Sequence, residues 1–163
     1  MRVFSKACLM SGFNVQGFAL IGRGRRVFPV TAFVKIDKSP ILSKQVEEPD
    51  FYIVFDNTLG LDAKPADAKG TERISFKEKS IVLFNSPEKM VFPQLKKRKV
   101  KSYFVDATEI ALNTLKSNTP NTVMLGALAK LFNKVSIKNI KSAMEGMSRE
   151  NFAAFDEGCK NLR

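Results

Sequence analysis

Three short, mostly apolar runs, each followed by a polar residue, constrain the fold of this chain most strongly. They occupy residues 51–55, 80–84 and 103–105, and the residues that follow them are Asp56, Asn85 and Asp106. Short runs without alternation are typical of strands that are covered on both faces, as in a parallel sheet with helices on each side. The chain is therefore predicted to form a layered α/β domain.

A second kind of strand precedes these runs. Residues 29–36 alternate strictly between two faces, which is the period of a β-strand, and Asp37 opens a turn that ends at Pro40. Ile41 and Leu42 are expected to begin a returning strand. This region is therefore predicted to be a β-hairpin.

The last third of the chain changes to helical periodicity and is predicted to contain four helices or helical segments. The second of them, over residues 122–132, is strongly apolar and contains Gly126. A glycine inside a helix costs about 1 kcal/mol relative to alanine, so Gly126 predicts close packing against another backbone. The four helices are expected to begin near Asp106, Thr122, Ser136 and Ser148.

The fold class is therefore α/β, with a layered and largely parallel sheet, one β-hairpin and helices packed on the sheet. Residues 61–79 carry little amphipathic signal and are predicted to be a loop or a poor helix. Because the chain contains no internal repeat and no linker, residues 1–163 are predicted to form a single domain.

The carboxyl ends of the three predicted strands form the first candidate site, because ligands of open α/β sheets collect there. Two interpretations apply: the polar residues at these ends bind a ligand, or they cap the turns and helices that follow. Capping alone explains these residue types, so it is the favoured interpretation. The candidates are Asp56, Asn57, Thr58, Asn85, Ser86, Asp106 and Thr108.

The composition excludes several kinds of self-contained chemistry. The chain has no histidine and only two cysteines, Cys8 and Cys159. Serine–histidine and cysteine–histidine nucleophile pairs, imidazole zinc sites and a four-cysteine cluster within this chain are therefore excluded. Apolar runs are shorter than the ~20 residues of a membrane span and no signal-peptide pattern opens the chain, so a cytoplasmic location is expected.

The charge is strongly basic and unevenly placed. There are 27 basic and 16 acidic residues, a formal net charge of +11, and residues 1–36 contain no acid. A basic run spans residues 96–101, and no carboxylate lies between Glu109 and Glu145. Such segments attract nucleic acid, acidic proteins or phosphate-bearing cofactors, although a solvated face is the favoured interpretation of the 96–101 run.

A glycine–arginine segment over residues 22–29 is the second candidate site, and it contains Arg25 and Arg26. Glycines allow close approach of the backbone to a ligand, and clustered guanidinium groups suit phosphate or carboxylate. Charge alone leaves three interpretations open: a phosphate ligand, an acidic partner surface or a solvated bend.

Two ordered blocks of the sequence resemble a known family. GRGRRVFPVTAFVKID, followed by EEPDFYIVFDNTL, and then SYFVDATEIALNTLKSNTPNTVMLGALAKLFNKVSIKNIKSAME are similar to the gamma subunit, or gamma domain, of 2-oxoacid:ferredoxin oxidoreductases, especially pyruvate synthase. That family opens with a strand, a Gly-x-Gly-Gly-Gln-Gly loop and a helix, of which residues 6–10 look like the tail. We therefore expect either a shortened gene model or a fold that tolerates the gap.

The resemblance implies a function shared with other chains. Such complexes decarboxylate a 2-oxoacid on thiamine diphosphate, pass electrons through iron–sulfur clusters to ferredoxin and transfer the acyl group to coenzyme A, or run in reverse. The cofactor ligands belong to the alpha, beta and delta subunits, so this chain is expected to be inactive alone, to bind none of these cofactors by itself and to lie near coenzyme A.

Four residues are expected to make functional contacts, and no residue is expected to be catalytic. Arg25 and Arg26 are predicted to contact an anion or a partner, and Asn121 and Thr122 are predicted to form a contact at the start of the second helix. Two alternatives remain: a basic nucleic-acid-binding module, and a non-catalytic structural subunit.

Overall fold

The computed structural model describes residues 1–20, 31–43, 46, 48–56, 76–89, 95–96 and 98–163. It divides into two compact units. Unit 1 contains Met1–Val46 and Phe132–Met147, and unit 2 contains Glu47–Leu131 and Ser148–Arg163. The predicted poor helix of residues 61–79 lies outside the described residues except for its last four positions.

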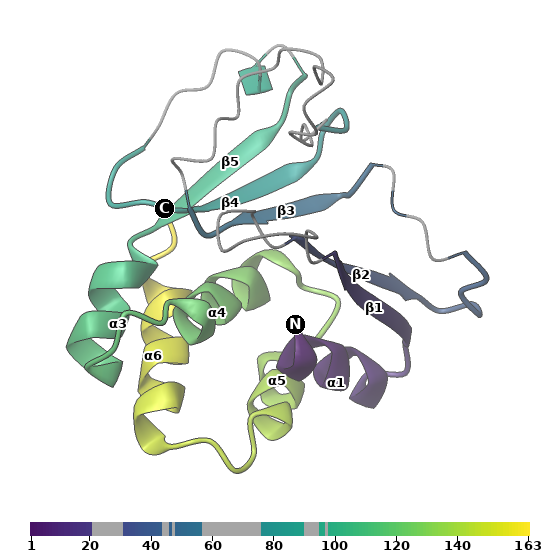
Figure 1. The fold of residues 1–163 in the computed structure, drawn as a ribbon. Coiled ribbons are helices and arrows are strands. Elements are labelled where there is room, and N and C mark those ends of the chain that lie inside the picture. Colours follow the sequence, from purple (N-terminus) through teal and green to yellow (C-terminus); the bar gives the residue numbers. More distant parts are fainter. Residues whose placement is uncertain (21–30, 44–45, 47, 57–75, 90–94, 97) are drawn as a thin grey trace. The chain divides into compact units, whose positions relative to one another are not determined.

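Unit 2 is built on a three-stranded parallel sheet of β3 (Phe51–Val54), β4 (Ile81–Asn85) and β5 (Lys101–Val105), in the order β3-β4-β5 (Figure 1). The prediction that the three apolar runs are parallel strands is confirmed. Cover on both faces holds for the middle strand, in which Val82, Leu83 and Phe84 are at most 1% exposed. It is wrong for β3, where Tyr52 and Val54 are buried on one face but Ile53 on the other face is 37% exposed, because that face is incompletely covered at Ile53.

One face of this sheet carries an aromatic core. The Phe84 and Phe104 rings stack with their centroids 5.3 Å apart, and Tyr52 packs against Phe76 at 4.7 Å. The opposite face buries Leu83 and Val105, and α4 (Asn121–Leu131) contacts β4. Both faces of the sheet are therefore covered over its centre, as the sequence predicts.

The last third of the chain forms α3 (Ala107–Leu115), α4, α5 (Ile137–Ala143) and α6 (Arg149–Lys160), which confirms the four predicted helices. Asp106 caps α3 by accepting a hydrogen bond from the Glu109 amide at 3.0 Å. Ser136 caps α5 through the Asn139 amide at 3.1 Å. Ser148 precedes α6 but accepts its bond from the Asn151 side chain instead of a backbone amide.

Two glycines allow α4 and α6 to meet backbone to backbone. A Cβ atom on Gly126 would lie 2.0 Å from the carbonyl oxygen of Phe155, and a Cβ on Gly158 would lie 2.0 Å from that of Val123. The contact is reciprocal, because Phe155 lies three positions before Gly158 on α6 and Val123 lies three positions before Gly126 on α4. The close approach predicted from Gly126 is confirmed, and Gly158 is its reciprocal partner.

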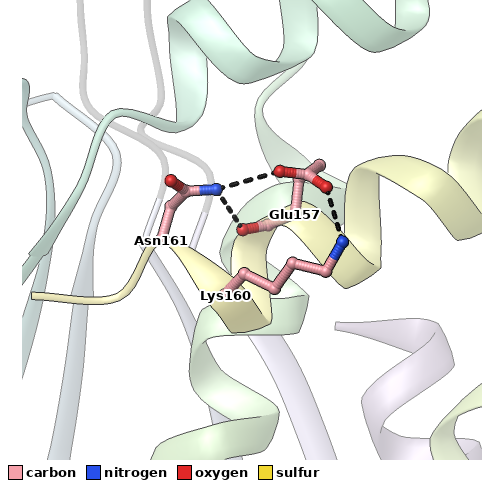
Figure 2. Close-up of polar contacts among 3 residues, drawn as sticks. All are labelled: Glu157, Lys160 and Asn161. Carbon is pink, nitrogen blue, oxygen red and sulfur yellow. Dashed lines mark hydrogen bonds and ion pairs between the residues drawn. The ribbon is translucent and has the colours of Figure 1, made fainter.

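The end of α6 is held by a local polar cluster (Figure 2). Asn161 donates to the Glu157 carbonyl oxygen at 2.9 Å and to its carboxylate at 3.1 Å, and Lys160 donates to the same carboxylate at 2.9 Å. The hydrogen bond from Lys160 lowers the pKa of Glu157. Beyond the cluster, the Arg163 and Phe104 backbones exchange two hydrogen bonds of 2.8 and 2.9 Å, so that the last residue pairs with β5.

Unit 1 contains α1 (Arg2–Met10) and an antiparallel hairpin of β1 (Asn14–Leu20) and β2 (Thr31–Asp37). The predicted strand of residues 29–36 is confirmed over its described part, but the expected returning strand at Ile41 and Leu42 is wrong. Those residues are outside any strand and Leu42 is 96% exposed. The partner of β2 is β1, which precedes it and already supplies the hydrogen bonds of the hairpin.

In unit 1, α1 and α5 lie side by side (Figure 1). The Phe4 and Phe132 rings meet edge to face at 5.3 Å, and Asn139 donates to the Ser11 hydroxyl at 2.8 Å. Cys8 is buried on the inner side of α1, and burial raises the pKa of its thiol to about 11. This thiol is therefore protonated at neutral pH and poorly reactive.

Within the described residues, no helix is both long and apolar enough to cross a membrane.

Candidate functional site

A hollow of about 370 Å³ lies at the carboxyl ends of the three parallel strands of unit 2. The topology explains its position, because parallel strands all end at the same edge of a sheet. The hollow is surrounded by residues from the ends of β3, β4 and β5, from the start of α3 and from the connection between α3 and α4. They are Phe55, Asp56, Asn85, Pro87, Asp106, Thr108, Asn118 and Pro120.

Asn85 is the central residue of this hollow. Its amide nitrogen donates to the Phe55 carbonyl oxygen at 3.1 Å and to the Thr108 hydroxyl at 2.8 Å. Its amide oxygen accepts from the backbone amides of Ala107 at 3.0 Å and Thr108 at 3.2 Å. One side chain therefore ties the end of β3 to the start of α3 across the end of β4.

The backbone amides at the amino terminus of α3 already have hydrogen-bond acceptors within the protein. The Asn85 side chain accepts hydrogen bonds from the amides of Ala107 and Thr108, and the Asp106 side chain accepts one from the amide of Glu109. The Ile110 amide donates to the Asp106 carbonyl oxygen. The free amides of a helix start are what usually bind a phosphate at this edge of an α/β sheet. Since α3 offers none of these four, the geometry does not provide that kind of anion site.

The charges around the hollow point the same way. Within the part of the chain that the structure describes, its lining includes the carboxylates of Asp56 and Asp106 and no basic side chain. Such a lining disfavours phosphates and carboxylates and suits neutral polar or cationic groups. Among the residues that the structure describes, no cluster of three or more His, Cys, Asp or Glu could hold a metal ion.

The predicted candidates at the strand ends are thus brought together, and they act mainly as caps and braces. Asp106 caps α3, and Asn85 satisfies two amides of the same helix, as the favoured interpretation predicts. Ser86 is buried and exchanges hydrogen bonds with the Glu88 backbone. Asn57 and Thr58 lie outside the described residues.

The other predicted site residues lie apart from the hollow or outside the described ranges. Arg25 and Arg26 fall in the second group. Asn121, the first residue of α4, is exposed, whereas Thr122 is buried and donates to the Asn151 side chain at 3.0 Å. Through Asn151 and Ser148, Thr122 joins the start of α4 to the start of α6.

Sequence reasoning missed part of the lining of the hollow. Asn118 and Pro120 come from the connection between α3 and α4, and Pro87 from the turn after β4. In the sequence these residues look like ordinary turn and loop residues. Only the return of the chain after α3 to the edge where that helix began brings Asn118 and Pro120 beside the strand ends, and no local pattern predicts that return.

Comparison with known proteins gives a consistent result. A family model described as pyruvate ferredoxin/flavodoxin oxidoreductase matches residues 1–161. The pyruvate/ketoisovalerate oxidoreductases common subunit gamma of Pyrococcus furiosus is 39% identical over 147 residues, which are 88% of this chain and 76% of that protein. The pyruvate synthase subunit PorC of Thermotoga maritima is 34% identical over 153 residues, or 93% of this chain and 76% of that protein.

Solved structures match the fold described above. The crystal structure of the pyruvate oxidoreductase subunit PORC of Thermotoga maritima superposes with a TM-score of 0.75 and 32% identity, over 99% of this chain and 86% of that one. A 2-oxoglutarate:ferredoxin oxidoreductase of Magnetococcus marinus has a TM-score of 0.71 at 18% identity, over 97% of this chain and 27% of that one, and supports the fold alone. The α/β class with a parallel sheet and a hairpin is therefore confirmed.

Proposed function

The chain belongs to the pyruvate ferredoxin/flavodoxin oxidoreductase family, and on this basis we propose that it is the gamma subunit of a 2-oxoacid:ferredoxin oxidoreductase with pyruvate as its substrate. The complex decarboxylates the 2-oxoacid oxidatively, forms acetyl-coenzyme A and reduces ferredoxin, or catalyses the reverse synthesis. The observation that carries this proposal is the family match over residues 1–161, together with gamma and PorC relatives at 34–39% identity.

The chemistry of the chain agrees with a subunit that depends on others. Thiamine diphosphate carries a diphosphate, and the described hollow offers two carboxylates and no cation to it. An iron–sulfur cluster takes four protein ligands, most often cysteines, and the chain has two cysteines and no histidine. We therefore assign the cofactor ligands to the alpha, beta and delta subunits and derive no catalytic step from the residues of this chain.

This assignment predicts assembly and activity that depend on the chain. When the tagged full-length chain is purified from its host, we expect the alpha, beta and delta subunits to copurify. The preparation should reduce a viologen dye only when both pyruvate and coenzyme A are added. A branched 2-oxoacid tested in parallel would show whether the substrate range is wider than pyruvate.

A matched preparation of the other three subunits without this chain should lose most of that activity. Recovery of the tagged chain as a lone monomer from a native extract would contradict the proposal. Dye reduction that is independent of any 2-oxoacid would contradict it as well. A cytoplasmic complex, as we propose, should be recovered without detergent.

We assign to Arg25 and Arg26 a contact with an anion or with an acidic partner surface, which is the role their glycine–arginine segment supports. Among the anions of the reaction, coenzyme A has the phosphates that two adjacent guanidinium groups suit. Asn121, exposed at the start of α4, is assigned a partner contact, and Thr122 positions that start through Asn151.

Replacement of both Arg25 and Arg26 by Ala is expected to raise the KM for coenzyme A about tenfold and leave the KM for pyruvate unchanged, because charge-assisted phosphate contacts are lost. The double Lys variant should recover part of the loss. Lys89→Ala with Lys96→Ala, two exposed lysines of unit 2, is the matched control. Loss of subunit assembly with unchanged KM would assign the two arginines to the partner surface instead.

A further inference from the structure

Two turns at the amino ends of β4 and β5 carry several basic side chains. Lys79 precedes β4, Arg98 and Lys99 precede β5, and Lys101 is the first residue of β5. All four are exposed, and Glu78 is the one acidic residue of residues 76–80 and 98–101. We call these four residues the basic edge, because they lie at the end of the sheet opposite to the acidic hollow.

Hydrogen bonds hold the two turns side by side. The Lys79 amide donates to the Arg98 carbonyl oxygen at 3.2 Å, and the Lys101 amide donates to the Ser80 carbonyl oxygen at 3.0 Å. The Arg98 guanidinium donates to the Phe76 carbonyl oxygen at 2.8 Å, which ties the second turn to the first. The fold therefore gathers the four cations, which come from two separate segments, at one end of the sheet.

Two lysines of the basic edge occupy backbone positions that favour glycine. Lys79 has a φ of 60° and Lys99 has a φ of 55°, both in the left-handed region. Glycine adopts this region at lower cost than a residue with a Cβ atom. A lysine at such a position points to a use for its charge, because the turn itself does not require the side chain.

The basic edge has charge without an apolar centre. No ion pair joins any of its four residues to another described residue, whereas the neighbouring Lys77 pairs with Asp50 at 2.7 Å. The large apolar side chains that are exposed in the described ranges all lie outside the two turns. Permanent subunit interfaces are built around apolar surface, so the basic edge suits a partner that binds briefly and is guided by charge.

An acidic protein fits the basic edge better than a nucleic acid does. Single strands are bound by exposed aromatic rings, and duplexes by a helix or strands placed in a groove. Residues 77–80 and 98–101 contain no aromatic residue, and they form turns that lead into strands of the sheet. Among the partners of the proposed reaction, the electron carrier is the protein that must bind and leave in every turnover.

We propose that the basic edge docks a carboxylate-rich surface of the ferredoxin that the complex reduces. This inference rests on the proposed function, which supplies the electron carrier. Positive charge at the edge attracts an acidic protein and speeds its association, most strongly at low ionic strength. The KM for ferredoxin should therefore rise steeply with salt, whereas reduction of a small viologen dye needs no protein docking.

Charge reversal in the assembled complex tests the proposal. With Lys79→Glu, Lys99→Glu and Lys101→Glu together, the KM for ferredoxin at low salt is expected to rise about tenfold and most of its salt dependence should disappear. Reduction of the dye by the same complex should change less than about twofold. Arg98 is left in place because it ties the two turns together.

The matched control reverses three exposed lysines of unit 2 that lie outside the two turns. It combines Lys89→Glu, Lys116→Glu and Lys130→Glu, and it should change the KM for ferredoxin less than about twofold. Because both variants change the net charge of the chain equally, a difference between them reports the position of the charges.

A pair of glycine substitutions separates the charge from the backbone conformation. Lys79→Gly with Lys99→Gly removes two charges and suits the left-handed backbone, so the complex should assemble while the KM for ferredoxin rises about threefold. Lys116→Gly, at a third lysine with positive φ, is the matched control and should leave this KM unchanged. If the charge-reversed chain does not assemble, the glycine pair decides the test.

Four results would contradict the inference. An unchanged KM for ferredoxin in an assembled variant would overturn it alone. Loss of the other subunits from both variants would assign the basic edge to a subunit contact instead. RNA binding by the wild-type complex that the variants lose, with the KM for ferredoxin unchanged, would assign it to nucleic acid. A wild-type complex that reduces neither ferredoxin nor the dye with pyruvate and coenzyme A would overturn the proposed function and this inference with it.

Discussion

Replacing Gly126 by Ala is expected to lower the free energy of unfolding of unit 2 by about 3 kcal/mol, at the upper end of what overpacking usually costs. The new Cβ would lie 2.0 Å from the Phe155 carbonyl oxygen, which belongs to a helix backbone and cannot rotate away. The two helices must therefore separate. Both tyrosines of the chain, Tyr52 and Tyr103, are in unit 2, so tyrosine fluorescence during urea unfolding reports this unit.

Gly158→Ala should cause a similar loss, because its Cβ would meet the Val123 carbonyl oxygen at the same distance. The double variant should lose less than the sum of the two, since the first separation already makes room for the second methyl group. Lys130→Ala, at an exposed position of α4 in the same unit, is the matched control, and stability should change by less than about 0.5 kcal/mol. A fully stable Gly126→Ala chain would show that α4 and α6 do not meet through these glycines.

Asn85→Ala is expected to be the most damaging substitution at the strand ends, with a loss of about 2–3 kcal/mol, because it leaves the Phe55 carbonyl and the Ala107 and Thr108 amides without their partner. Amide exchange at Ala107 and Thr108 should accelerate more than at the other residues of α3. Tyrosine fluorescence in urea measures the accompanying loss of stability.

Asn85→Asp separates the accepting role of this side chain from its donating role. The carboxylate can still accept from the two amides at the positive end of α3, but it cannot donate to the Phe55 carbonyl. A loss of about 1 kcal/mol is expected, smaller than that of the Ala variant. Asn113→Ala, an exposed position of α3, should change stability by less than about 0.5 kcal/mol. Equal losses for the three variants would mean that Asn85 does not brace the sheet.

The elements that could be predicted from the sequence are those whose signal is local. Unbroken apolar runs identified the three parallel strands, and cap residues such as Asp106 and Ser136 marked helix starts within one or two positions. Gly126 predicted a backbone contact because a glycine inside a helix is costly unless close packing requires it. In each case the residue type is explained by the contact that it makes.

The parts that could not be predicted depend on partners far apart in the chain. β1 lacks a strong alternation, since it contains Gly17 and Ala19, and only pairing with β2 makes it a strand. The hollow lies at the predicted strand ends, where Asn85 and Asp106 cap α3 as the favoured interpretation predicts. Asn85 reaches the amides of Ala107 and Thr108 because β5 is the neighbour of β4, and no single segment of the sequence specifies that neighbour.

The pairing of Arg163 with Phe104 has a consequence for aggregation. An outermost strand with free amides and carbonyls can recruit strands from other molecules and grow into fibril-like assemblies. The two backbone bonds between Arg163 and Phe104 occupy the rim of β5 at this point. A strand from another molecule can therefore pair with β5 at Phe104 only after the Arg163 backbone has moved away, so this pairing guards the rim of β5 against polymerisation at that point.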